Sequence, residues 1–194
     1  TDEQINFSPA SFPQDAKSIT TEPEYISYLN TRGINLTDYN FYYSTKEMPN
    51  RIIVPIVWNK TKIGYVARAI QQDTKPKYYA NVQAGSLFNL DAQHWSRKYV
   101  ILTEGVFDAI MIDGVAILGS EISNKQKLQI DALNRKVIIV PDRDKAGSKL
   151  VEESIEQGWC VSMPEWSQDI SDVGDAVSKY GRLYTLYSIV NAAN

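Results

Sequence analysis

The half of the sequence that follows residue 96 alternates short apolar runs with segments of helical periodicity, and this pattern constrains the fold most. The apolar runs, which we predict to be strands, cover residues 99–103, 115–118, 136–140 and 159–163. The predicted helices cover residues 106–112, 123–133, 146–157 and 171–180. Short apolar strands that alternate with helices are typical of a parallel sheet with helices on both of its faces. We therefore predict an α/β fold for this part of the chain.

The preceding residues, 21–96, have a different pattern and predict a small α+β lobe. Its helix is expected to begin at a capping box formed by Thr21 and Glu24, with a proline early in the first turn. The helix is expected to end at Gly33, because glycine readily adopts the backbone conformation that closes a helix.

Two strand-like runs follow in this lobe, at residues 51–58 and 62–70. Pro55 lies inside the first run, which predicts an edge position or a bulge there, because proline cannot donate a ladder hydrogen bond. The predicted division of the whole chain is an irregular arm or linker at 1–20, the α+β lobe at 21–96, the parallel-sheet domain at 97–181 and a C-terminal helix at 182–194.

The counts of special residues exclude several classes of protein. Cys160 and His94 are the only cysteine and histidine in the chain, so neither a disulfide framework nor a zinc site built from these residues is possible. No apolar run approaches the roughly 20 residues that a membrane helix needs, and the first residues do not resemble a signal peptide. We expect no membrane association and a cytoplasmic location.

The charges are unevenly distributed although the net charge is only −3. Residues 46–79 hold seven basic and two acidic residues, whereas residues 97–194 hold 11 basic and 14 acidic ones. This distribution indicates a protein that binds a polyanion on one lobe and cations on the other.

Acidic residues follow three of the predicted parallel strands. In such sheets, functional sites lie beyond the carboxyl ends of the strands. Carboxylate oxygens are hard ligands that suit Mg²⁺ or Mn²⁺, and a repulsive group of acids is stabilised by cations bound between its members. An Asp after a strand is also a common helix cap, so each residue taken singly has a second, structural interpretation. The six candidates are Glu104, Asp108, Asp142, Asp144, Asp169 and Asp172.

These acids belong to a set of motifs that resembles a TOPRIM domain. The motifs are TEGVFDA at 103–109, GS at 119–120, DRDKAG at 142–147 and QDISD at 168–172. The resemblance implies a TOPRIM-type parallel sheet, a domain that occurs in primases, topoisomerases, recombination mediators and some nucleases.

The segment upstream of these motifs resembles the corresponding segment of DnaG-type primases. It contains RIIVPI at 51–56, GYVARA at 64–69, PKYY at 76–79 and LF at 87–88. The end of the motif set is most similar to the primases of T-even-like bacteriophages. The resemblance implies an RNA-polymerase core that makes short RNA primers on single-stranded DNA by two-metal nucleotidyl transfer.

The resemblance also implies roles for individual residues. It makes Glu104, Asp108, Asp142 and Asp144 catalytic, and all six acids metal-proximal. Arg51, Arg68 and Lys77 match basic positions that face nucleotide phosphates and nucleic acid. Tyr78 is a candidate for base stacking, with core packing as the alternative. The chain departs from the family pattern at Leu90, where many bacterial primases have a lysine, and in the D-x-x-D spacing at residues 169–172.

The implied cofactor is Mg²⁺ or Mn²⁺, with no zinc in this chain. The implied partners are a single-stranded DNA template, ribonucleoside triphosphates and a replicative helicase, and a zinc-binding domain is expected elsewhere in the full-length protein. A phage-encoded protein of this kind would act in the host cytoplasm. Two alternatives stay open: a metal-dependent TOPRIM nuclease, and a non-catalytic nucleic-acid-binding or recombination-mediator module.

Overall fold

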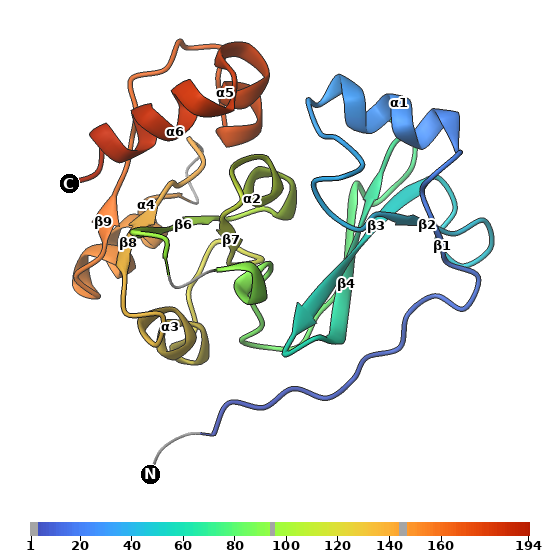
Figure 1. The fold of residues 1–194 in the computed structure, drawn as a ribbon, viewed down its shortest axis with the longest axis horizontal. Coiled ribbons are helices and arrows are strands. Elements are labelled where there is room, and N and C mark those ends of the chain that lie inside the picture. The colour runs from blue at the N-terminus through green and yellow to red at the C-terminus, as the bar shows by residue number, and fades with distance from the viewer. Residues whose placement is uncertain (1–3, 94–95, 144–146) are drawn as a thin grey trace. The chain divides into compact units, whose positions relative to one another are not determined.

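The computed structural model describes residues 4–93, 96–143 and 147–194 (Figure 1). The chain divides into two compact units, Thr1–Ala84 and Gly85–Asn194. Each unit has its own sheet, and the units are described separately below. No helix of the described residues is long and apolar enough to cross a membrane.

The first unit is built on a five-stranded antiparallel sheet with the order β1-β2-β3-β4-β5. Its long hairpin turns at Asn59 and Lys60, which both have positive φ angles (46° and 64°), as the tightest hairpin turns require. The elements are β1 (Lys17–Ser18), α1 (Pro23–Thr31), β2 (Tyr42–Tyr43), β3 (Arg51–Trp58), β4 (Thr61–Ala69) and β5 (Tyr78–Asn81).

Two local predictions for this unit have different outcomes. Pro55 lies beyond the short β2, which pairs only with Ile52 and Ile53, and next to a register shift at residues 56–57, so the expected edge or bulge is confirmed. The prediction of a capping box at the start of α1 is wrong. The N-cap is Glu22 and makes no side-chain cap hydrogen bond, and the helix begins at Pro23, whose fixed φ suits the first position of a helix.

The second unit contains a four-stranded parallel sheet with the order β7-β6-β8-β9. The strands are β6 (Tyr99–Thr103), β7 (Val115–Ala116), β8 (Lys136–Ile139) and β9 (Cys160–Val161). The helices are η1 (Leu90–Ala92), α2 (Val106–Ile112), α3 (Asn124–Asp131), α4 (Gly147–Glu156), α5 (Val173–Tyr180) and α6 (Arg182–Asn191).

Side chains of successive strand residues enter two separate cores, one on each face of this sheet. Val100 and Leu102 of β6 pack in a core with Ile130 of α3 and Leu150 of α4. Ile101, which lies between them, packs in a second core that includes residues of α2, α5 and α6. Helices therefore cover both faces of the parallel sheet, as the α/β prediction required.

The second unit begins earlier in the chain than the domain predicted at residue 97. Residues 85–93 belong to it because Phe88 forms an antiparallel bridge with Ala116 and Asn89 donates its side-chain amide to the Gly114 carbonyl. α3 begins at the cap expected from the sequence, since Ser123 and Gln126 form a complete capping box.

Candidate functional site

The carboxyl ends of β6 and β8 bring two of the predicted acids together. β6 and β8 are parallel neighbours in the sheet, so their ends lie side by side. Glu104 follows β6 directly, and its Oε2 accepts a hydrogen bond of 2.8 Å from the backbone N–H of Asp142, which lies beyond the end of β8. Both residues are half-buried. The edge predicted to carry the acidic site therefore has a hydrogen bond joining two of its segments.

Asp108 is held at the same end of the sheet by a different segment. It lies in the first turn of α2, where its charge is favoured by the helix dipole. Its Oδ1 accepts a hydrogen bond of 2.7 Å from the backbone N–H of Gly174 in α5. A Cβ atom at residue 174 would lie 3.0 Å from this oxygen, so glycine permits the close approach.

Asp172 has the structural role that the sequence left open as its alternative. It is the N-cap of α5, and its Oδ1 accepts a hydrogen bond of 2.7 Å from the backbone N–H of Asp175. The same oxygen lies 3.2 Å from the position of a Cβ added to Gly174, so Asp108 and Asp172 flank one glycine.

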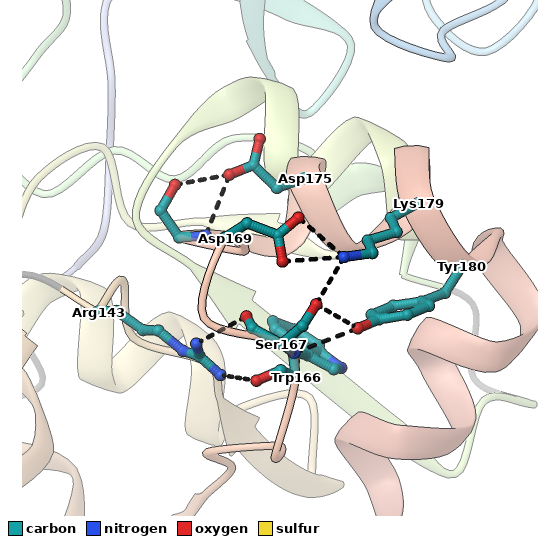
Figure 2. Close-up of polar contacts among 8 residues, drawn as sticks. Arg143, Trp166, Ser167, Asp169, Asp175, Lys179 and Tyr180 are labelled. Carbon is teal, nitrogen blue, oxygen red and sulfur yellow. Dashed lines mark hydrogen bonds and ion pairs between the residues drawn. The ribbon is translucent and has the colours of Figure 1, made fainter.

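Asp169 is paired with a lysine (Figure 2). Lys179 of α5 donates to both carboxylate oxygens of Asp169, at 2.9 and 2.8 Å. This hydrogen-bonded ion pair, together with a hydrogen bond from Ser167, lowers the pKa of Asp169 from 3.8 to about 2. Any cation that binds Asp169 would have to compete with the lysine ammonium.

The donor chemistry at this edge fits Mg²⁺ or Mn²⁺, since Glu104, Asp108 and Asp142 all offer carboxylate oxygens from anchored positions. Within the part of the chain that the structure describes, no three Asp, Glu, His or Cys residues form a group that could hold a metal ion. Asp144, the second acid of the DRD motif, lies outside the described residues. The metal-binding roles of the six acids stay predictions.

The segment at 164–171 is linked to the loop after β8 and to α5, and sequence reasoning missed both links (Figure 2). Arg143 donates to the carbonyl oxygens of Pro164, Trp166 and Ser167. Ser167 is in turn hydrogen-bonded to Tyr180 at 2.8 Å. The sequence offered one signal for the first link: in an extended segment, successive side chains are expected on opposite sides, which would direct Arg143 away from the side of Asp142.

Next to this link lies a pocket of about 450 Å³. Its lining combines five apolar residues with two serines and three charged residues, and the charged ones are Asp142, Arg143 and Glu165. The pocket therefore adjoins the acidic edge.

The first unit contains a basic pocket of about 340 Å³. Its cationic lining residues are Arg32, Arg68, Lys75 and Lys77, and none of the lining residues that the structure describes is acidic. Arg68 is only 6% exposed, donates through Nε to the hydroxyl of Tyr28, and has its guanidinium carbon 4.7 Å from the centroid of the Tyr78 ring. Arg68 and Lys77, predicted separately from the sequence, thus line one pocket.

Arg51 and Tyr78, which were both predicted to contact nucleotide or nucleic acid, differ in their exposure to solvent. Arg51 is 6% exposed, and its Nη2 donates to the Pro76 carbonyl at 2.6 Å, so it anchors the segment that precedes Lys77. Its Nη1 is buried and has no hydrogen-bond partner among the described residues. Tyr78 is 47% exposed. The nucleotide-binding roles of these residues stay predictions.

Comparison with known protein families identifies the acidic segment. Residues 101–176 match the family described as Toprim-like. The match begins within β6, ends in the middle of α5 and includes all six predicted acids. A Toprim domain is therefore present in the second unit.

Similar curated proteins are DNA primases. The DNA primase of Thermotoga maritima is 33% identical over 125 residues, which are 55% of this chain and 21% of that protein. The DNA primase of Halalkalibacterium halodurans is 31% identical over 150 residues, 68% of this chain and 25% of that protein. The matched region is thus about a fifth to a quarter of the length of these relatives.

Solved structures of primases share the fold. The DnaG catalytic core has a TM-score of 0.68 at 17% identity, covering 88% of this chain and 73% of that one. The primase fragment of the bacteriophage T7 primase-helicase protein has a TM-score of 0.62 at 15% identity, covering 95% and 79%. The chain has the mixed α/β fold of the DnaG catalytic core, and its homologues support a primase function.

Proposed function

We propose that this chain is the RNA-polymerase core of a DNA primase, which synthesises short RNA primers on single-stranded DNA by two-metal nucleotidyl transfer. The observation that carries the proposal is the pair of hydrogen bonds at the end of the parallel sheet. The Asp142 N–H donates to Glu104, and the Gly174 N–H donates to Asp108, so three acid-bearing segments are held at one edge. Relatives that are DNA primases support the same function.

Glu104, Asp108, Asp142 and Asp144 would hold Mg²⁺ or Mn²⁺, which when bound would activate the attacking 3′-hydroxyl and neutralise the leaving pyrophosphate. The backbone N–H groups that bind Glu104 and Asp108 favour the charged forms of both carboxyl groups and fix their orientation. Asp169 and Asp172 belong to the proposed acidic set as well, although metal binding by Asp169 requires that it leave Lys179.

The basic pocket of the first unit would hold phosphates of the nucleotide or of the nucleic acid. Arg68 and Lys77 line it, and an arginine can bind phosphate through two parallel hydrogen bonds. Arg51, which the family resemblance places at a phosphate-facing position, would contribute by holding Pro76 next to Lys77. Tyr78 would add a ring for base stacking.

The proposal includes the partners that such an enzyme needs. These are the single-stranded template, the ribonucleoside triphosphates, a replicative helicase and a zinc-binding domain that reads the template. The similarity to the T7 primase fragment, which belongs to a primase-helicase protein, supports the helicase link. We further propose that the protein acts in the cytoplasm. If it is encoded by a phage, this is the cytoplasm of the host cell.

A primer-synthesis assay tests the proposal. The chain is incubated with single-stranded DNA, labelled ribonucleotides and Mg²⁺ or Mn²⁺, and is compared with Asp142→Asn and with Glu156→Gln, an exposed acid at the end of α4. Short RNA products that are lost in Asp142→Asn and kept in Glu156→Gln support a primase. DNA cleavage without synthesis would instead indicate a nuclease, and neither activity would indicate a non-catalytic module.

A further inference from the structure

We propose that Arg143 is a positioning residue for the metal site: it holds the loop that carries Asp142 against the 164–171 segment and so sets the position of that carboxylate. The inference rests on the proposed function, since the metal site is part of it. Arg143 binds backbone carbonyl oxygens and is not proposed as a metal ligand; it would act through Asp142.

The side chain of Arg143 donates hydrogen bonds to three carbonyl oxygens. Nη1 donates to Ser167 at 3.2 Å, and Nη2 donates to Pro164 at 3.2 Å and to Trp166 at 3.0 Å. The planar guanidinium presents its donors in a rigid fork, which one ammonium group cannot reproduce. Three carbonyl oxygens of one short segment therefore define where residue 143 lies.

The backbone of the same loop is fixed from two sides. The N–H of Arg143 donates to the Ser171 carbonyl at 3.2 Å. The N–H of the preceding residue, Asp142, donates to Glu104 at 2.8 Å. Consecutive amides are thus attached to the 164–171 segment and to the end of β6, and the Asp142 side chain projects from this junction.

Residues of α5 hydrogen-bond to the 164–171 segment and fix its position. Lys179 donates to Ser167 Oγ at 2.8 Å and to Asp169, and the Ser167 N–H donates to Tyr180 at 3.2 Å (Figure 2). α5 also binds Asp108 through the Gly174 N–H. Arg143 therefore connects the loop that carries Asp142 to the helix that holds Asp108.

The contacts of Arg143 lie partly in solvent, and this separates positioning from stability. Two of its three side-chain hydrogen bonds are exposed, so water can replace the guanidinium on those carbonyl oxygens without leaving buried groups unpaired. A variant at this position should remain folded while the loop loses its fixed position. Partners that orient metal ligands affect metal affinity by roughly 10- to 100-fold.

The test measures Mn²⁺ binding to the 194-residue chain, by electron paramagnetic resonance of the free ion, together with primer synthesis. We expect Arg143→Gln to bind Mn²⁺ roughly 10- to 100-fold more weakly, and Arg143→Lys to be intermediate. The Mn²⁺ concentration for half-maximal synthesis should rise by the same factor, while the rate at saturating Mn²⁺ recovers. The matched control is Arg135→Gln. Arg135 also donates to a backbone carbonyl, but it lies just before the start of β8, at the end of the strand away from Asp142.

The outcomes distinguish the inference from the proposed function. If Asp142→Asn loses Mn²⁺ binding while folded Arg143→Gln and Arg143→Lys both keep it, the inference is overturned and the proposed function stands. If Asp142→Asn binds Mn²⁺ as the unmodified chain does, the metal site itself is refuted, and the inference with it. Should Arg143→Gln fail to fold, Arg143→Lys decides: unchanged Mn²⁺ affinity overturns the inference, and a weakened affinity supports it.

Discussion

The substitution Gly174→Ala tests whether metal binding depends on the position in which Gly174 holds Asp108. Residue 174 lies in the first turn of α5, where alanine is normally favoured over glycine by up to about 1 kcal/mol. An added Cβ would however lie 3.0 Å from Asp108 Oδ1, 3.2 Å from Asp172 Oδ1 and 3.4 Å from Met111 Sδ. These are ends of side chains, which can move by a few tenths of an ångström.

The added Cβ and the weakened hydrogen bond both act against the gain in helix propensity, so we expect the free energy of unfolding to fall by about 1–2 kcal/mol. The same displacement moves Asp108 away from the position in which it would bind a metal ion. Its Oδ1 must move away from the Gly174 N–H that it accepts from at 2.7 Å, and a hydrogen bond to a charged group contributes about 1.5–3 kcal/mol. Because the Gly174 N–H orients Asp108 as a metal ligand, we expect the Mn²⁺ affinity to fall roughly 10- to 100-fold.

Urea unfolding and Mn²⁺ titration of the same samples measure both quantities. The matched control is Gly119→Ala, because an added Cβ there meets no atom within 4 Å. The control should leave Mn²⁺ binding unchanged. If Gly174→Ala binds Mn²⁺ as tightly as the control does, the reasoning that Asp108 must be held at this glycine is refuted.

Three further predictions concern other parts of the chain. Gly64→Ala should destabilise the first unit by about 1–3 kcal/mol or more in urea unfolding, because its Cβ would lie 2.3 Å from the backbone oxygen of Asn81. The ion pair with Lys179 and a hydrogen bond from Ser167 lower the pKa of Asp169 from 3.8 to about 2, so these contacts stabilise the fold above pH 3.8 and are lost as the pH falls through 2. Lys179→Met should reduce this contribution, which urea unfolding between about pH 2 and 5 measures. Lys77→Ala should weaken binding to single-stranded DNA and reduce the slope of log K against log salt by about 0.7.

Each of these predictions has a result that contradicts it. Equal stability of Gly64→Ala and Gly119→Ala would mean that β5 can move away from β4 at no cost. An unchanged acid dependence in Lys179→Met would mean that the ion pair does not form in solution. Lys46→Ala removes an exposed lysine outside the basic pocket, and a salt slope that falls equally in this variant would show that Lys77 has no special place in binding.

The acidic site was only partly predictable, because local patterns place residues along the chain and do not show which partners they find. The position of Glu104 after β6 and of Asp142 beyond β8 was predictable, since the carboxyl ends of parallel strands share one edge. The pairing of Asp169 with Lys179, ten residues away, was not, because it depends on how the loop turns back onto α5. The capping role of Asp172 was predicted only as an alternative.

The basic residues show the same limit. Their number between residues 46 and 79 indicated a surface for a polyanion, and the pocket that contains Arg68 and Lys77 agrees with that expectation. Sequence reasoning did not predict that Arg51 and Arg68 would be buried. Each guanidinium has a hydrogen-bond acceptor, a carbonyl for Arg51 and a tyrosine hydroxyl for Arg68, which offsets part of the cost of burying the charge.

The amino-acid sequence by itself determined the parallel sheet with helices on both faces, because the spacing of apolar residues follows directly from helix and strand periodicity. It also determined which acids stand at the strand ends. Only the tertiary structure decided that Gly174 holds Asp108 and that Arg143 grips the carbonyl oxygens of the 164–167 segment. These contacts join segments far apart in the chain through backbone groups, which every residue type carries and no motif records.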